Sequence, residues 1–163
     1  MTTPHRTPIP PPQLTALEDV RTTLSRVWMI GAGLVFIVLV VQSLIGVYAD
    51  LTEDAWGWFL PTILPTLTMI LTVLTYTALD PTMTGFVVRK TFASTATWLS
   101  IFYLLVVSLT FVTQPFIFSS LASQKERAAA AITLMRMSNL WLGPLQGLVA
   151  SALGVLFVSK HKP

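Results

Sequence analysis

The side chains that could do chemistry inside the apolar segments of this chain are uncharged amides and hydroxyls. Gln42, Gln114 and Gln146 each lie four to six residues from one end of a long apolar segment. If those segments are helices, a rise of 1.5 Å per residue places all three amides about 6 to 9 Å below one membrane face, the outer one. Thr62 and Thr66 reach a similar depth. The spacing predicts one polar layer, which either clamps the helices together by hydrogen bonds or lines a water-filled path.

Charged side chains are missing from the same segments, which argues against catalysis. Enzymes, haem proteins and coupled transporters of the membrane need such groups within the bilayer. The two histidines, His5 and His161, lie outside the apolar segments, and there is no cysteine. A serine nucleophile would therefore find no histidine or lysine base there. We expect no enzyme activity, no cofactor and no metal site.

Four segments without a charged residue must position these side chains. Each is at least as long as the roughly 20 residues that a helix needs to cross a hydrocarbon core about 30 Å thick. Only 10% of the residues are charged, and the mean hydropathy is +0.72, values typical of an integral membrane protein. The sequence predicts an all-α bundle of four membrane-spanning helices. The predicted spans are about 27–49, 57–79, 95–118 and 140–158.

A single membrane domain, residues 14–159, accounts for most of the 163 residues. Residues 1–13 contain five prolines and are predicted to form an extended, flexible tail, and residues 160–163 form a basic tail. Seven of the ten lysines and arginines fall on the side of the two tails. Because basic residues favour the cytoplasmic side, both termini are predicted to be cytoplasmic, with a bacterial plasma membrane as the default location. The basic residues thus indicate topology, and we expect no binding of nucleic acid.

The connection between the third and fourth spans is too polar to cross the bilayer but is predicted to be helical. Its alanine run favours a helix, and Ser123 and Glu126 have capping-box spacing. We expect an extra interfacial helix at about 122–138 in the outer loop, ended by Gly143 and Pro144. The alternative is that these residues extend the fourth span straight into solvent.

Helix kinks are predicted at three of the prolines within the predicted spans, Pro61, Pro65 and Pro144. Pro61 and Pro65 lie one turn apart, and Pro65 has no N–H to donate to the carbonyl of Pro61. The second helix must therefore bend there or recruit another donor. Pro144 interrupts the start of the fourth span in the same way. The second helix is also rich in threonine, so it is our candidate for the lining of a pore or the centre of the bundle.

Small residues on the fourth span predict a close helix contact. Gly143, Gly147 and Ser151 repeat at four-residue spacing, and Gly154 adds a further small residue near this face. Such a groove lets a second helix approach tightly in a membrane. That helix could belong to a neighbouring span, to another copy of the chain or to another subunit.

These features predict a protein that acts by association in the lipid bilayer. The first hypothesis is a non-enzymatic multi-pass protein, either a self-assembling homo-oligomer or an accessory subunit of a membrane complex. The alternative is an oligomeric pore-forming or membrane-permeabilising protein with a path lined by threonine and glutamine. Uncharged constrictions can gate by dewetting, so the lack of charged rings does not exclude a pore.

Overall fold

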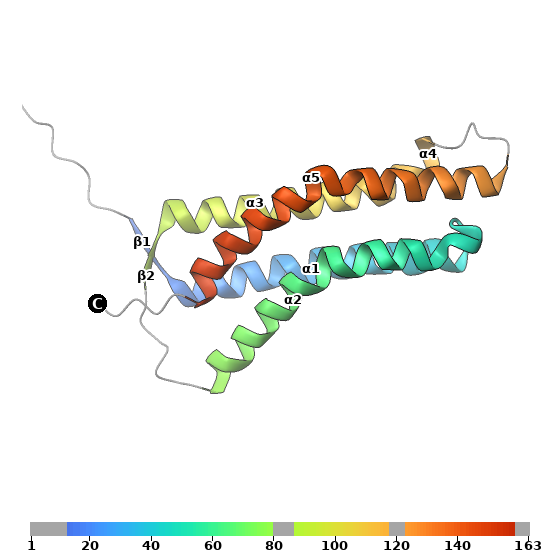
Figure 1. The fold of residues 1–163 in the computed structure, drawn as a ribbon. Coiled ribbons are helices and arrows are strands. Elements are labelled where there is room, and N and C mark those ends of the chain that lie inside the picture. Colours follow the sequence, from blue (N-terminus) through green and yellow to red (C-terminus); the bar gives the residue numbers. More distant parts are fainter. Residues whose placement is uncertain (1–12, 80–86, 118–122, 159–163) are drawn as a thin grey trace, which may run out of the picture.

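The computed structural model describes residues 13–79, 87–117 and 123–158 of the chain. Within these ranges four long helices form the bundle (Figure 1): α1 (Leu17–Leu44), α2 (Thr52–Leu79), α3 (Lys90–Val112) and α5 (Gln124–Val158). Each contains a segment long and apolar enough to cross a membrane, which confirms the predicted helical bundle. The two predicted tails, 1–13 and 160–163, lie outside the described residues except for Gln13.

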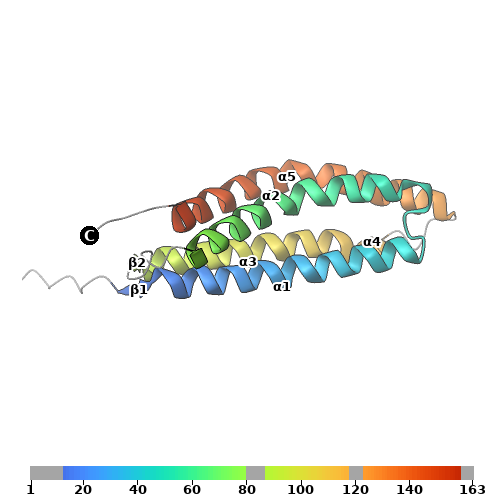
Figure 2. The same cartoon turned by 90° about the horizontal axis from the view of Figure 1, so that it is seen from below.

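The helices occupy four corners of the bundle. Helix α1 packs beside α2 and α3, and α5 packs beside the same two helices (Figures 1 and 2). Helices α2 and α3, which follow each other in the chain, therefore lie at opposite corners. We call the end where α1 and α3 begin and α5 finishes the terminal end. The end where α1 finishes and α2 and α5 begin is called the loop end.

Short elements are found at both ends of the bundle. At the terminal end, β1 (Leu14–Ala16) and β2 (Val87–Arg89) pair in antiparallel fashion. These strands lead directly into α1 and α3, so they hold the starts of the two helices together. At the loop end, the 3₁₀ helix η1 (Ala49–Leu51) precedes α2, and α4 (Gln114–Ile117) follows α3. The sequence pattern does not predict either strand.

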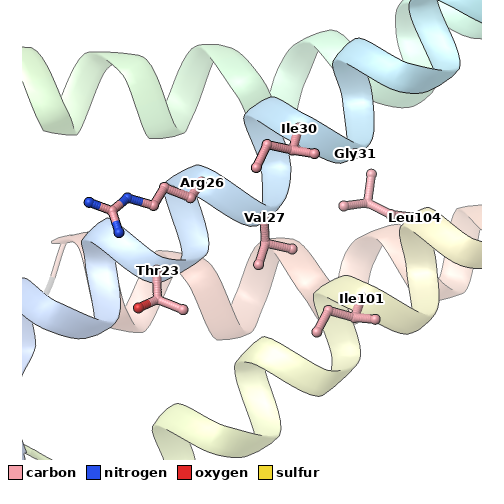
Figure 3. Close-up of a pocket in the computed structure, with 7 residues that line it drawn as sticks. All are labelled: Thr23, Arg26, Val27, Ile30, Gly31, Ile101 and Leu104. Atoms are coloured by element: carbon pink, nitrogen blue, oxygen red, sulfur yellow. The ribbon is translucent and has the colours of Figure 1, made fainter.

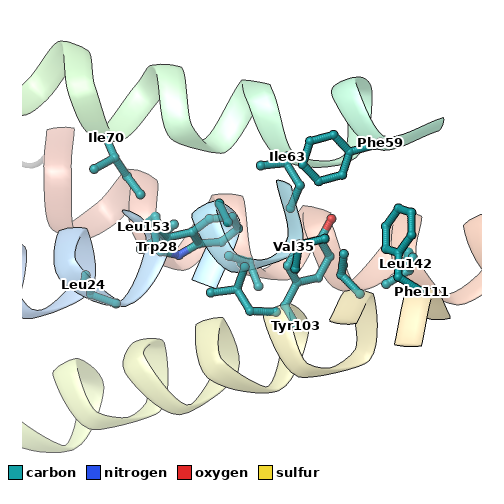
Figure 4. Packing of buried hydrophobic residues seen from close by; sticks show 14 of the residues in the cluster. Leu24, Trp28, Val35, Phe59, Ile63, Ile70, Tyr103, Phe111, Leu142 and Leu153 are labelled. Carbon is teal, nitrogen blue, oxygen red and sulfur yellow. The ribbon is translucent and has the colours of Figure 1, made fainter. Parts of the chain in front are cut away.

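Large aromatic side chains fill the core between the helices (Figure 4). Trp28 of α1 and Tyr103 of α3 are fully buried, with ring centroids 5.8 Å apart. Trp58 of α2 meets Phe111 of α3 edge to face at 5.2 Å. On the outside, large apolar side chains such as Leu140 are exposed. In a bundle that spans a membrane, such outer side chains contact lipid tails, and tight interior packing holds the helices together.

Helix α5 differs from the predicted arrangement of an interfacial helix followed by a span. It is one helix of 35 residues, so at 1.5 Å per residue it is about 52 Å long, well beyond a hydrocarbon core of about 30 Å. Pro144 lies inside it and does not end it. A separate interfacial helix at 122–138 is therefore not seen in the described residues, and the alternative of a straight extension describes α5 better.

The reason is that the first half of α5 packs on protein. Ala131, Ile132 and Met135 are buried in the core cluster, and α5 contacts η1. The amide of Gln124 donates a 2.6 Å hydrogen bond to the carbonyl of Gly46. The predicted capping box is present, since the N–H of Glu126 donates to Ser123 Oγ at 3.2 Å. Local sequence thus starts the helix as expected, while packing in the core and against η1 buries part of its first half.

Candidate functional site

The first cluster of polar side chains lies at the loop end and joins α1 to α3 and α4. Tyr48 is fully buried, and its hydroxyl is hydrogen-bonded to Gln42 Oε1 and lies 3.3 Å from Gln114 Oε1. Gln42 Nε2 donates to the carbonyl of Phe111 at 3.3 Å. Gln42 and Gln114, which the spacing places in one layer, are thus brought together by a tyrosine. Burial raises the pKa of the Tyr48 phenol, so the group stays a neutral donor at physiological pH.

The second cluster surrounds the two prolines of α2. Because Pro65 has no N–H, the carbonyl of Pro61 lacks its helical donor. Gln146 of α5 supplies one instead, with its Nε2 3.4 Å from that carbonyl and 3.2 Å from the carbonyl of Thr62. The hydroxyl of Tyr103 donates to the same Thr62 carbonyl at 2.9 Å. Side chains of α3 and α5 therefore meet α2 at the backbone carbonyls between its two prolines, a segment that we call the proline turn.

Four of the five predicted layer residues, Gln42, Gln114, Gln146 and Thr62, fall into these two clusters and not into one ring. Tyr103 and Phe111 are eight residues apart on α3, so the clusters lie about 12 Å apart along the bundle. The predicted depth of Gln146 is counted from a span that begins near residue 140, whereas α5 begins at Gln124. Thr66 is buried on α2, one turn beyond the proline turn. The hydroxyl of Thr62 donates a 2.7 Å hydrogen bond to the carbonyl of Trp58 in its own helix.

The chemistry available to these groups is hydrogen bonding to backbone. The donors of Gln42, Gln146 and Tyr103 all bind main-chain carbonyls of another helix. Such contacts typically stabilise a membrane bundle by about 0.6 to 2 kcal/mol each. Among the described residues, the buried Nε2 of Gln114 has no hydrogen-bond partner. Within one chain, the two clusters therefore clamp helices at fixed levels.

A basic residue at the terminal end has a role that counting charges does not predict. Arg21 of α1 is buried, and its Nε and Nη2 donate to the carbonyls of Leu156 and Phe157, each at 3.0 Å. Its guanidinium also lies 5.9 Å from the ring centre of Phe157. Carbonyls in the last turn of a helix have no helical partner, so a cation there is favourable. Arg21 thus fastens the end of α5 to the start of α1, although these helices lie at opposite corners.

The small residues of α5 lie on the outside of the bundle. Gly143, Gly147 and Ser151 are exposed, and Gly154 is half-buried. A Cβ built on any of the three glycines would have no atom of the described residues within 4 Å, apart from its own helix and chain neighbours. The face is therefore not the contact of α5 with another described span. We call Gly143, Gly147 and Ser151 the assembly face.

Comparisons with protein-family models, with curated proteins and with solved structures found no match to this chain.

The close helix approach inside the chain occurs elsewhere, at Gly31 of α1. A Cβ at Gly31 would lie 2.7 Å from Leu104 Cδ1 of α3, closer than carbon atoms pack. A lone glycine in an apolar segment gives no signal that it faces a leucine rather than lipid. Tyr48 and Arg21 give a faint signal, since each polar side chain lies near the end of a predicted span. The partners of Arg21, and Gln114 beside Tyr48, are distant in the sequence.

Proposed function

We propose that this protein acts by association within the membrane, as a self-assembling bundle that uses the assembly face of α5. The observation that carries the proposal is that three small residues at four-residue spacing are exposed on α5, and that a Cβ built on Gly143 or Gly147 would meet no other described helix. On this proposal the protein is not an enzyme. Its terminal end would face the cytoplasm of a bacterial plasma membrane, as its basic residues predict.

The chemistry of the assembly face supports a helix partner. In a membrane, small residues let two backbones come close and gain van der Waals contact that lipid tails do not match. The one hydroxyl on the face is already satisfied, since Ser151 Oγ donates to the carbonyl of Gly147 at 2.8 Å. Exposed Leu148 and Val155 lie seven residues apart, in one row along one side of the face, and would pack against the partner. A partner helix would thus meet a smooth face bordered on one side by an apolar ridge.

A matched pair of glycine variants tests the proposal. Gly147→Leu fills the assembly face, whereas Gly33→Leu adds the same side chain on α1, where a Cβ also has free space among the described residues. We expect the labelled protein in liposomes to show oligomers by stepwise photobleaching. Gly147→Leu should shift them to monomers, and Gly33→Leu should leave them intact. Oligomers of unchanged size in Gly147→Leu would refute the assembly face.

Two further outcomes separate the alternatives left open by the sequence. A wild-type chain that is monomeric at every protein-to-lipid ratio would contradict self-assembly and leave the role of an accessory subunit. An oligomeric pore would release a small dye or ions from the same liposomes, and Gln42→Leu or Gln114→Leu would alter that flux. Because Gln42, Tyr103 and Gln146 donate to backbone within one chain, we expect tight liposomes.

A further inference from the structure

An open groove lies between α1 and α3, on the side of the bundle that these two helices form. Its volume is about 400 Å³. Figure 3 shows the side chains that line it, with Arg26 extending toward the start of α1. The residues that matter for its shape and charge are Thr23, Arg26, Ile30, Gly31, Ile101 and Leu104.

The groove is apolar along most of its length and has a polar end. From Thr23 to Gly31 it follows eight residues of α1, which is about 12 Å. The close approach of Gly31 and Leu104, where a Cβ would lie 2.7 Å from the leucine methyl, closes the deep end. Ile30 and Ile101 form the walls between. A slot of this length and chemistry fits part of an acyl chain.

The polar end carries a cation without an anionic partner. The ion pair found in the described ranges is Arg136 with Asp54, at the other end of the bundle. Arg26 is exposed and makes no ion pair in those ranges, and Thr23 lies one turn before it on the same side of α1. An arginine fork beside a hydroxyl is suited to a phosphate group.

The depth of Arg26 matches the position of a lipid headgroup. Gly31 and Leu104 lie at one level, and counting back five residues on α1 and six on α3 reaches Arg26 and Trp98. The two side chains therefore start within about 1.5 Å of the same depth. Trp98 is 68% exposed, as tryptophans are at the interface between lipid tails and water. The cation thus lies at headgroup level, with the apolar slot below it.

We propose that this groove binds one anionic phospholipid, with its phosphate on Arg26 and Thr23 and one acyl chain between Ile30 and Ile101. A free phosphate would leave the apolar walls unused, and an uncharged lipid would leave the cation unused. The site does not rest on the proposed function, because it uses α1 and α3 while the assembly face belongs to α5.

Native mass spectrometry tests the site on the full-length protein in detergent with equal amounts of phosphatidylglycerol and phosphatidylcholine of the same acyl chains. We expect wild type to retain phosphatidylglycerol preferentially. Arg26→Gln should weaken that lipid about tenfold and remove the preference, because one charge-assisted contact is lost. Ile30→Trp, which changes a side chain 64% exposed, should fill the slot and lower the retention of both lipids.

Arg89→Gln is the matched control, since Arg89 is an exposed arginine at the same end of the bundle but outside the groove. It should keep the preference for phosphatidylglycerol. If Arg89→Gln weakens that lipid as much as Arg26→Gln does, the attraction is a diffuse effect of net charge and the site is refuted. An unchanged preference in Arg26→Gln, or unchanged retention in Ile30→Trp, would refute it equally.

Discussion

Gln146 Nε2 of α5 lies 3.4 Å from the carbonyl oxygen of Pro61 on α2, the carbonyl that Pro65 leaves without a helical donor. The same amide reaches the next carbonyl, that of Thr62, at 3.2 Å. A proline inside a helix costs about 3 kcal/mol, partly through the lost hydrogen bond. In lipid, where water cannot replace that bond, a donor from another helix lowers the cost. The proline pair of α2 and the contact of α2 with α5 are therefore parts of one arrangement.

A double-mutant cycle follows from this contact. Gln146→Leu should lower the free energy of unfolding by about 1 kcal/mol, since it leaves the Pro61 carbonyl unpaired. In a Pro65→Ala background, residue 65 regains an N–H that can pair with Pro61, so the cost of Gln146→Leu should shrink. Denaturant unfolding of all four proteins in the same detergent measures this coupling. An equal cost in both backgrounds would show that Gln146 does not serve the proline turn.

The sequence predicts the need for this donor but not its identity. Pro65 alone shows that the carbonyl of Pro61 lacks a donor, because the missing N–H concerns residues of a single helix. Which helix provides the amide depends on α5 lying beside α2, and hydropathy gives no order of helices around a bundle. The four spans are predictable for the opposite reason, since their length and lack of charge are local properties.

Local sequence leaves the extended α5 as an alternative and does not predict the buried arginine, and the physical reason is the same. Residues 124–138 have helix-forming alanines and an apolar face, and local sequence does not say whether lipid or protein covers that face. In the structure protein covers part of it, since Ala131, Ile132 and Met135 are buried in the core cluster. Arg21 is one of the basic residues that the charge count uses for topology, but its partners, Leu156 and Phe157, lie 135 and 136 residues away in the chain. Contacts of that separation require the packed fold.

The buried phenol of Tyr48 predicts a dependence of stability on pH. Burial raises its pKa in the folded protein above the ordinary value of 10.0. Above pH of about 10 the unfolded chain loses this proton before the folded protein does. The folded state then binds more protons, so the stability that Tyr48 provides is full below that pH and declines as the pH rises.

Tyr48→Phe isolates this group because it keeps the ring and removes the hydroxyl. At pH 8 it should lower the free energy of unfolding by about 1 kcal/mol, through the lost hydrogen bond from the hydroxyl to Gln42 Oε1. Between pH 9 and 11 its melting temperature should fall less steeply than that of the wild type. Thermal unfolding in one detergent across that pH series measures both effects. Parallel slopes for the two proteins would contradict a buried, hydrogen-bonded phenol.

Arg21 holds the end of α5, so the loss of this contact should make the bundle open first at that helix end. Arg21→Met keeps most of the side chain's length against Phe157 but removes the two donors at 3.0 Å. The unpaired carbonyls should let the last turn of α5 fray, so amide exchange in residues 150–158 should speed up about tenfold. Hydrogen exchange measured by mass spectrometry would follow that segment, with Arg89→Met as a control for the lost charge. Faster exchange spread evenly over α1, α3 and α5 would instead indicate general destabilisation, and unchanged exchange in 150–158 would show that Arg21 does not hold the helix end.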